Sequence, residues 1–495
     1  MFYIVVIFLY LGALIVVGAW HARRIKSQED FAVAGRSLTV PILVGTMLTT
    51  WIGTGSLMGN AEKTYEIGIA FIVVPIGSVL GIMLIAMVAA RVRRFGQITV
   101  LDILETRYGV VPRLLGTVAI VTAYLVIVSY QYRAGGAVLH RINEDIPLSL
   151  CIQIAAGFII VYTVLAGLVS VARTDVVNGV IMVAGIAFAL PWLFAKAGGF
   201  AGLTEAFADT PEKMQVFGPI GWLKLIGYSL PAFLLVMGEA NLYQRFFAAR
   251  NPRSAQTAAI ILVFAVAIVE VAIILTAWVA SALVPLDDNY GHVLLIAAKD
   301  LLPAAVGALM LAAAVAIIVS TADSFLLVVS TSVVRDIYHR FLNPNASPKR
   351  LVFASRLAVI ALGLIAYGVS LTSDQFLEVA LWAYTVYGAS ITPALIATFF
   401  WKRATSSAAA ASIACGTVVT ITWSLLQKYD VFADSAWQNV DAVIPAITAS
   451  ILALVVISLL THKPDPSCWA PFTKESPLPN RPPQADKGAA RLADT

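Results

Sequence analysis

Charged side chains are scarce in this chain of 495 residues. Asp, Glu, Lys and Arg together make up 12% of it, which is about half of their usual share in a soluble domain. Hydrophobic residues make up 60%, and the mean hydropathy is +0.87. Such a composition cannot cover a folded domain with a water-soluble surface, so we expect a membrane protein.

Cysteine is equally scarce. The three cysteines, Cys151, Cys415 and Cys468, have neither the paired spacing of disulfides nor the spacing of a metal cluster. The sequence also shows no nucleophile–base pair, metal-binding motif or phosphate-binding loop, so we do not expect an enzyme. The formal charge of +5 comes from basic residues at the ends of apolar runs and gives no sign of nucleic-acid binding.

Long apolar runs follow one another along the chain. Most are long enough to cross about 30 Å of hydrocarbon as helices, and the short alternating segments of a membrane barrel are not seen. The run at residues 2–20 differs from a signal peptide, because its basic residues follow it rather than precede it. We therefore predict an all-α polytopic protein with about thirteen transmembrane helices, at 2–20, 37–60, 66–90, 113–139, 148–169, 175–195, 221–246, 255–283, 303–332, 350–371, 377–401, 406–427 and 442–461.

The loops between these runs alternate in charge. Basic clusters lie at 21–26, 91–94, 250–253, 349–350 and 402–403. Acidic residues lie in the other set of loops, at 144–145, 205–212, 287–288, 374 and 430–434. Because cytoplasmic loops carry the excess of Lys and Arg, we expect the N-terminus outside and the C-terminus in the cytoplasm, in the plasma or inner membrane.

Two groups of five helices follow the first helix. The first helix of each group contains glycine and polar residues, at Thr49–Gly55 and at Met237–Arg245. Each group has an odd number of spans, so the groups run in opposite directions, and paired interrupted helices in inverted halves point to a transporter site at mid-membrane. The alternative is that the glycines serve close helix packing.

This pattern predicts a division of the whole chain. We expect an extra N-terminal helix and cytoplasmic loop (1–36), a first inverted repeat (37–195), an extracellular loop (196–220), a second inverted repeat (221–401), two accessory helices (402–461) and a disordered cytoplasmic tail (462–495).

The ninth helix carries Ser320, Thr321, Asp323 and Ser324 in its apolar middle. Polar groups at this depth are expensive unless they have a role, and hydroxyls beside a carboxylate suit a hard cation. An interrupted helix would supply further oxygens from its free carbonyls. We predict a Na⁺ site made of Thr49, Ile52, Ile317, Ser320 and Thr321. The alternative is that the hydroxyls bond back to carbonyls of their own helix.

Asp175 opens the predicted sixth helix. One interpretation is capping against the helix dipole, with Thr174 as the N-cap. The other is that Asp175 is a way-station for sodium on its route to the cytoplasm. The two interpretations are compatible.

Two glutamates, Glu239 and Glu270, lie near the middle of helices, where each needs a partner or the protein interior. Glu239 lies in the interrupted stretch with Asn241 and Tyr243, so it is a candidate for substrate contact; pairing with Arg133 is the alternative. Glu270 has no polar neighbours in the sequence, which favours a protonated or paired structural group. Further substrate candidates are Trp51, Gly53 and Gln131.

Five stretches resemble the sodium:solute symporter family, which has the LeuT-type inverted-repeat fold. They are EDFAVAGRSL, TTWIGTGSLMGNAEKTY, YTVLAGLVSVARTDVVNG, NLYQRFFAARNPRSAQ and VSTADSFLLVVSTSVVRDIY, between about residues 29 and 410. The resemblance implies sodium ligation by Thr49, Ile52, Ile317, Ser320 and Thr321. It also implies that Asp175 takes part in sodium passage.

The sequence motif around Trp51 is most similar to that of the choline-transporter branch, where aromatic rings cage a quaternary ammonium group. Trp51 matches one ring of that cage, whereas Glu239 and Ile127 stand where the branch has two tryptophans. A carboxylate in place of a ring could favour a cationic or amino-bearing solute.

We therefore expect a Na⁺-coupled symporter that imports a small organic solute of amino-acid, amine, quaternary-ammonium or carboxylate type by alternating access. Its expected partners are sodium, the solute and the lipid bilayer, without nucleic acid or an obligate protein partner. The alternatives are a proton-coupled carrier that uses Glu239 or Glu270, and a transporter-like solute sensor.

Overall fold

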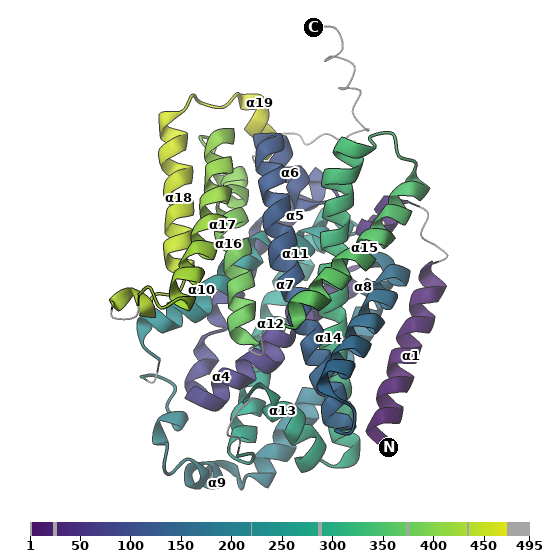
Figure 1. Cartoon of the computed structure of the whole chain (residues 1–495), viewed down its shortest axis with the longest axis vertical. Helices are drawn as coiled ribbons and strands as arrows, with labels where there is room; N and C mark the ends of the chain where they lie inside the picture. Colours follow the sequence, from purple (N-terminus) through teal and green to yellow (C-terminus); the bar gives the residue numbers. More distant parts are fainter. Residues whose placement is uncertain are drawn as a thin grey trace.

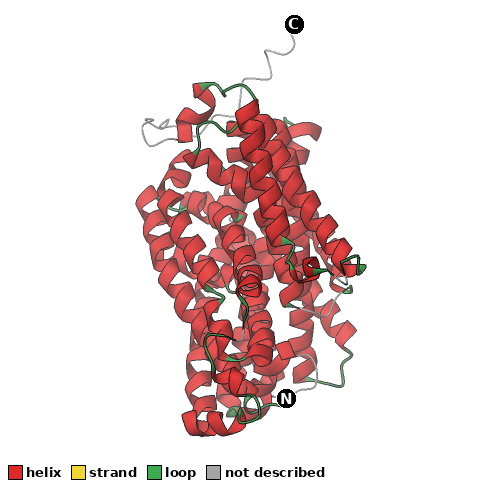
Figure 2. Cartoon of the chain, turned by 90° about the vertical axis from the view of Figure 1, so that its left-hand side faces the viewer, coloured by secondary structure: helices red, strands yellow, loops and turns green. Residues whose placement is uncertain are grey.

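The computed structural model describes residues 2–22, 27–218, 220–285, 290–372, 376–432 and 435–472. These residues form a bundle of helices along one long axis (Figures 1 and 2). Among them, the β-type pairing is one isolated bridge between Leu38 and Ala249. Several sequence predictions concern residues outside this part: the acidic positions 287–288, 374 and 434, most of the basic cluster at 21–26, and most of the tail after 461.

In the described part of the chain, eleven helices are long and apolar enough to cross a membrane. They are α1 (Phe2–Ala22), α5 (Ile76–Phe95), α7 (Val110–Ile142), α8 (Leu148–Lys196), α10 (Trp222–Gly238) continued by α11 (Ala240–Ala248), α12 (Pro252–Ser281), α14 (Ala304–Ser332), α15 (Pro348–Ser370), α16 (Leu377–Phe400), α17 (Ser406–Lys428) and α18 (Val443–Leu460). A bent pair, α3 (Val40–Trp51) with the segment Gly55–Ile67 that ends in α4 (Asn60–Ile67), makes a twelfth span.

The helix α8 has 49 residues and contains two spans. Its interior residue Gly167 has φ 58° and ψ 170°, outside helical geometry. The hydroxyls of Tyr162 and Thr174 lie 2.7 Å apart, although twelve residues of straight helix would separate the two Cα atoms by about 18 Å. The chain therefore turns back at Gly167, and counting the two halves of α8 separately gives the thirteen spans expected from the sequence.

We expect Gly167→Ala to lower the stability of the protein by about 1–3 kcal/mol, because this backbone region is essentially restricted to glycine. Thermal unfolding in detergent measures the effect. Gly157→Ala is the matched control, since Gly157 lies in the first half of α8 and a Cβ there would meet no atom within 4 Å. Equal melting temperatures for the two variants would contradict a strained turn at Gly167.

Both helices expected to be interrupted are broken. In the first, α3 ends at Trp51, Ile52 is extended (φ −73°, ψ 91°), and the two parts of the span bend by 54°. In the second, α10 ends at Gly238, Glu239 is extended (φ −61°, ψ 112°), and α11 begins at Ala240. The polar residues that interrupt each apolar run in the sequence thus coincide with the breaks.

The ninth span, α14, forms the centre of the bundle. It packs against α7, α8 and α3, and 78% of its most apolar stretch is buried, against 17% for the peripheral α1. The stretch Ala312–Ala316 consists of small residues and valine, and small residues let neighbouring helices approach closely. Its hydroxyl-bearing segment therefore faces other helices.

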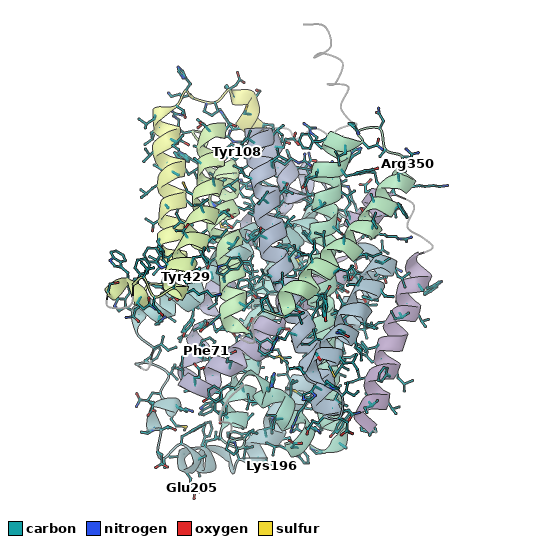
Figure 3. The ribbon with its side chains drawn as sticks, viewed as in Figure 1. Phe71, Tyr108, Lys196, Glu205, Arg350 and Tyr429 are labelled. Carbon is teal, nitrogen blue, oxygen red and sulfur yellow. The ribbon has the colours of Figure 1, made fainter. Side chains whose placement is uncertain are left out.

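Two of the charged loops predicted from the sequence lie at opposite ends of the bundle. Arg350 lies at the end that also carries α6 (Val100–Tyr108) and α19 (Pro466–Trp469), whereas Glu205 lies at the opposite end (Figures 1 and 3). This arrangement places a basic loop and an acidic loop on different sides of the membrane.

Candidate functional site

The break in the first interrupted helix faces the hydroxyl-bearing segment of α14. The Oγ1 atom of Thr321 lies 3.2 Å from the carbonyl oxygen of Thr49 and 3.4 Å from those of Thr50 and Ile52. These carbonyls are near the point where the regular helix stops, and the backbone N–H of Thr54 donates to the Gln131 side chain instead of to the helix. The break thus gathers backbone oxygens around one buried hydroxyl.

The other predicted sodium residues lie beside this point. Ser320 precedes Thr321 and is fully buried, and Ile317 is buried one turn earlier in α14. The hydroxyl of Thr49 bonds back to the Gly45 carbonyl at 3.0 Å, as hydroxyls in membrane helices often do. Thr49 therefore presents its carbonyl, and not its hydroxyl, to Thr321.

Asp175 joins the same region from the second half of α8. Its two carboxylate oxygens accept hydrogen bonds of 2.5 Å from Ser320 and from Thr46. The expectation that Asp175 caps a helix is wrong, because Asp175 lies two turns beyond Gly167, and the Thr174 hydroxyl donates to carbonyls of the preceding turn. The side chain of Asp175 instead points at the helix α14.

Arg245, on α11, is the residue that the sequence interpretation missed. It is fully buried, and its Nη2 atom lies 3.6 Å from the carboxylate of Asp175. It also donates to Thr46 at 2.9 Å, Thr50 at 2.5 Å and Ser324 at 2.7 Å. The sequence did contain a signal for this residue. Arg245 is a basic residue inside an apolar span of 27 residues, and such a residue needs a buried partner.

Asp323 adds a second carboxylate to this region. It is fully buried; one of its oxygens accepts from Ser324 at 3.3 Å, and the other has no hydrogen-bond partner among the described residues. With all three groups ionised, Asp175, Asp323 and Arg245 carry one excess negative charge. In an interior that excludes water, this excess favours a monovalent cation nearby.

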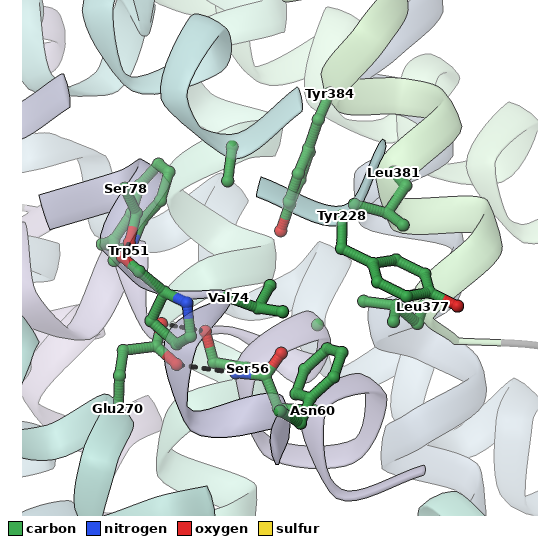
Figure 4. Close-up of a pocket in the computed structure, with 14 residues that line it drawn as sticks. Trp51, Ser56, Asn60, Val74, Ser78, Tyr228, Glu270, Leu377, Leu381 and Tyr384 are labelled. Atoms are coloured by element: carbon green, nitrogen blue, oxygen red, sulfur yellow. Dashed lines mark hydrogen bonds between the residues drawn. The ribbon is translucent and has the colours of Figure 1, made fainter. Parts of the chain in front are cut away.

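A small cavity of about 50 Å³ lies on the other side of the α3 break. Its wall comes from α3, the segment Gly55–Ile67, α5, α10, α12 and α16, and Figure 4 shows Trp51, Ser56, Asn60, Glu270 and Tyr384 around it. Trp51 is therefore the one predicted substrate residue that lines this cavity.

Glu270 lines the cavity together with two polar partners. Its Oε1 accepts from the Ser56 hydroxyl and its Oε2 from the Asn60 amide, both at 2.7 Å. Glu270 has no polar neighbours in the sequence, and both of its polar partners come from a segment more than 200 residues away.

The remaining predicted substrate residues lie elsewhere. Glu239 caps α11 by accepting from the backbone N–H groups of Asn241 and Leu242, and it also accepts from Tyr124 at 2.7 Å. The Tyr243 hydroxyl donates to the Met237 carbonyl at 3.3 Å. These side chains are buried around the second break and do not line the cavity. Arg133, the alternative partner of Glu239, donates instead to the Ser370 carbonyl.

Gly53 lies against Thr321 and Gln131, and neither Gly53 nor Gln131 lines the cavity. A Cβ on Gly53 would stand 3.0 Å from Thr321 Cγ2 and 3.1 Å from Gln131 Nε2, so a larger side chain would crowd both neighbours. The Gln131 Oε1 accepts from Thr54, whereas its Nε2 has no hydrogen-bond partner among the described residues.

A helical membrane bundle with two broken helices, one of which faces a cluster of buried oxygens, is the architecture of an ion-coupled transporter. The chain belongs to the sodium:solute symporter family, whose model matches residues 31–416. It is 26% identical to the sodium/proline symporter of Haemophilus influenzae, over 94% of this chain and 96% of the relative. It is 27% identical to the high-affinity proline transporter PutP of Bacillus subtilis, over 91% and 96% of the two chains.

Solved structures show the same fold. A Na⁺-coupled sialic acid symporter in a substrate-bound outward-open state superposes with a TM-score of 0.77 at 20% identity, over 94% of this chain and 98% of that one. MhsT in complex with L-phenylalanine superposes with a TM-score of 0.54 at 15% identity, over 85% and 98%. The predicted LeuT-type fold with two inverted repeats of five helices is confirmed.

Membership in this family has direct consequences for function. The chain is a multi-pass membrane transporter that imports a small solute, with Na⁺ as the coupling ion.

Proposed function

We propose that this chain binds its coupling sodium at the α3 break, between the carbonyls of Thr49 and Ile52 and the Ile317, Ser320 and Thr321 positions of α14. The observation that supports this site most directly is that the Thr321 hydroxyl lies within 3.4 Å of three carbonyl oxygens at the break. Hydroxyl and carbonyl oxygens are suitable ligands for a hard cation. With all three groups ionised, the neighbouring Asp175, Asp323 and Arg245 carry an excess negative charge that attracts such a cation.

In this proposal, sodium couples the two repeats. Sodium binding joins α3 of the first repeat to α14 of the second, and the residue next to Ile52 is Trp51, which lines the cavity. Sodium thereby organises the solute site, and solute binding must strengthen sodium binding by the same factor. Closure of the solute site precedes release to the other side, with Asp175 next along the sodium path.

The driving force for accumulation is the membrane potential together with the sodium gradient. One positive charge that moves down 100 mV releases about 2.3 kcal/mol. At about 1.36 kcal/mol per tenfold change, this supports about 50-fold accumulation of a neutral solute before any chemical sodium gradient is added.

We propose the N-terminus outside and the C-terminus in the cytoplasm. The end of the bundle with Arg350 then faces the cytoplasm, as the preference for positive loops on that side requires, and the end with Glu205 faces outwards (Figure 3). We also propose the repeat boundaries 37–195 and 221–401, with 1–36 and 402–461 as additions to the ten-helix core.

Thr321→Ala should raise the sodium concentration for half-maximal thermal stabilisation by about tenfold or more, since even partners of metal ligands change affinity by that much. The measurement is the melting temperature of purified protein titrated with NaCl at constant ionic strength in KCl, because a ligand of the folded state stabilises it by mass action. This test needs no knowledge of the solute.

Two variants serve as controls for this test. Thr321→Ser keeps the hydroxyl and should keep the sodium dependence. Thr398→Ala removes a buried hydroxyl that donates to the Ala394 carbonyl of its own helix at 3.1 Å, away from the α3 break, and it should leave the sodium dependence unchanged. An unaltered titration for Thr321→Ala would place the sodium site elsewhere, and stabilisation or uptake that persists at fixed pH in potassium alone would favour the proton-coupled alternative.

A further inference from the structure

We propose that the transported solute carries an ammonium group, either a simple amine or a zwitterion, and that Glu270 is the carboxylate that receives it. This inference rests on the proposed function, since it names the solute class for the cavity beside the sodium site.

When it is ionised, Glu270 has no counter-charge among the described residues. The side chain is 3% exposed, and no ion pair among the described residues involves it, although several link other buried groups. A buried ionised carboxylate is costly without a counter-charge. Ser56 and Asn60 each fill one acceptor position, whereas a carboxylate offers about four. The group therefore retains capacity for a charged donor.

The other walls of the cavity suit the same kind of ligand. Phe71, Trp51, Tyr228 and Tyr384 contribute four aromatic side chains to the fourteen lining residues. Aromatic faces attract ammonium groups, and tryptophan does so most strongly. A cation in this cavity would therefore meet one carboxylate and several rings.

The lining also argues against anionic solutes. No Lys, Arg or His is among the lining residues, so a simple carboxylate would face Glu270 without any counter-charge. A zwitterion remains compatible, because the Trp51 Nε1 atom is a buried donor without a hydrogen-bond partner among the described residues. It could donate to the carboxylate of a solute whose ammonium group lies at Glu270.

Two matched sets of probes test the proposal with the purified full-length protein in saturating NaCl. The first set is L-proline, pyrrolidine and cyclopentanecarboxylate, and the second is L-valine, isobutylamine and isovalerate. In each set, the second probe lacks the carboxylate of the amino acid and the third lacks its ammonium group; in cyclopentanecarboxylate a CH₂ group takes the place of the ring nitrogen. We expect at least one ammonium-bearing probe to raise the melting temperature of the wild type, and neither simple carboxylate to do so.

Glu270→Gln tests the residue itself, because glutamine keeps the size and an acceptor oxygen but removes the charge. We expect the affinity for the stabilising probe to fall by about 30-fold or more, as for the loss of one partner of a buried charge pair. The half-maximal sodium concentration without solute should stay at the wild-type value. Glu378→Gln, which alters an exposed carboxylate next to the lining residue Leu377, is the control and should change neither value.

Several outcomes would overturn the proposal. They are stabilisation by the simple carboxylates, no stabilisation by any ammonium-bearing probe, or an unchanged affinity in Glu270→Gln. A shift of the solute-free sodium titration in Glu270→Gln would show that this carboxylate holds a cation of its own, which also overturns it. The proposed sodium site fails by a different result, an unaltered sodium titration in Thr321→Ala, so the two failures are distinguishable.

Discussion

Arg245→Met is expected to be among the most damaging single substitutions in this chain. Arg245 is fully buried and provides the only guanidinium that the described structure pairs with Asp175. Its removal leaves Asp175 and Asp323 as two buried carboxylates, and loss of one partner of a buried ion pair costs about 3–5 kcal/mol. We expect a strongly lowered melting temperature and a reduced yield of monodisperse protein in detergent.

Charge, and not lost packing, should account for this effect. Methionine keeps much of the length of arginine, so the packing change is modest, and the double variant Arg245→Met with Asp175→Asn should recover part of the lost stability. Arg250→Met, at an exposed position five residues later, is the control and should melt close to the wild type. A double variant no more stable than Arg245→Met would contradict the electrostatic explanation.

The breaks in the helices could be predicted because their causes are local in sequence. Glycine and polar residues cluster within apolar runs at Thr49–Gly55 and at Met237–Arg245, and both runs break within those stretches. The helix boundaries predicted from the sequence were less accurate. The second span continues to Ile67, whereas the prediction ended it at residue 60. The helix that follows Gly167 also begins earlier than the predicted residue 175, because Gly167 alone supplies the turn and no longer loop is needed.

The residues of the candidate site could likewise be predicted only in part. Ser320 and Thr321 stand out as hydroxyls in an apolar helix, and they lie beside the α3 break as expected. The partners of Asp175 and Glu270 could not be predicted, because they come from residues between 70 and 214 positions away.

Local neighbours were misleading for the two mid-span glutamates. Glu239 has polar neighbours in the sequence, but the breaking of the helix makes it the N-cap of α11, where it accepts from the backbone N–H groups of Asn241 and Leu242. Glu270 has apolar neighbours in the sequence, but the bend in the first repeat brings Ser56 and Asn60 against it. Which glutamate faces a cavity is therefore decided by tertiary packing.

A second buried charge cluster joins the two repeats at the Arg350 end of the bundle. Arg113, on α7, is ion-paired with Asp102 and Glu105 of α6 and with Asp336, which lies in the π-helical continuation of α14 (Val333–Leu342). Burial alone would raise the pKa of Asp102, but Arg335 and Arg113 outweigh burial, so its pKa lies below the ordinary value. Asp102 therefore stabilises the fold at neutral pH, and this contribution is lost as the pH falls through the lowered pKa.

Arg113→Met should be the second strongly destabilising substitution. The guanidinium is 5% exposed and serves three carboxylates, so its loss should lower the free energy of unfolding by about 3–5 kcal/mol. Arg340→Met is a matched control, because Arg340 is ion-paired with the same Glu105 but is 45% exposed, and an exposed pair contributes about 0–1 kcal/mol.

The two variants change the net charge equally but differ in the ion pairs that they remove. Both lose one positive charge and one ion pair with Glu105, whereas Arg113→Met also loses the buried ion pairs with Asp102 and Asp336. If burial determines the result, Arg113→Met should melt well below Arg340→Met at neutral pH. The gap should narrow in acid as Asp102 becomes protonated, because the wild type and Arg340→Met then lose the stabilisation that Arg113 gives to the Asp102 carboxylate, which Arg113→Met lacks at every pH. A gap of the same size from neutral to acidic pH would assign the effect of Arg113 to packing instead of to its carboxylate partners.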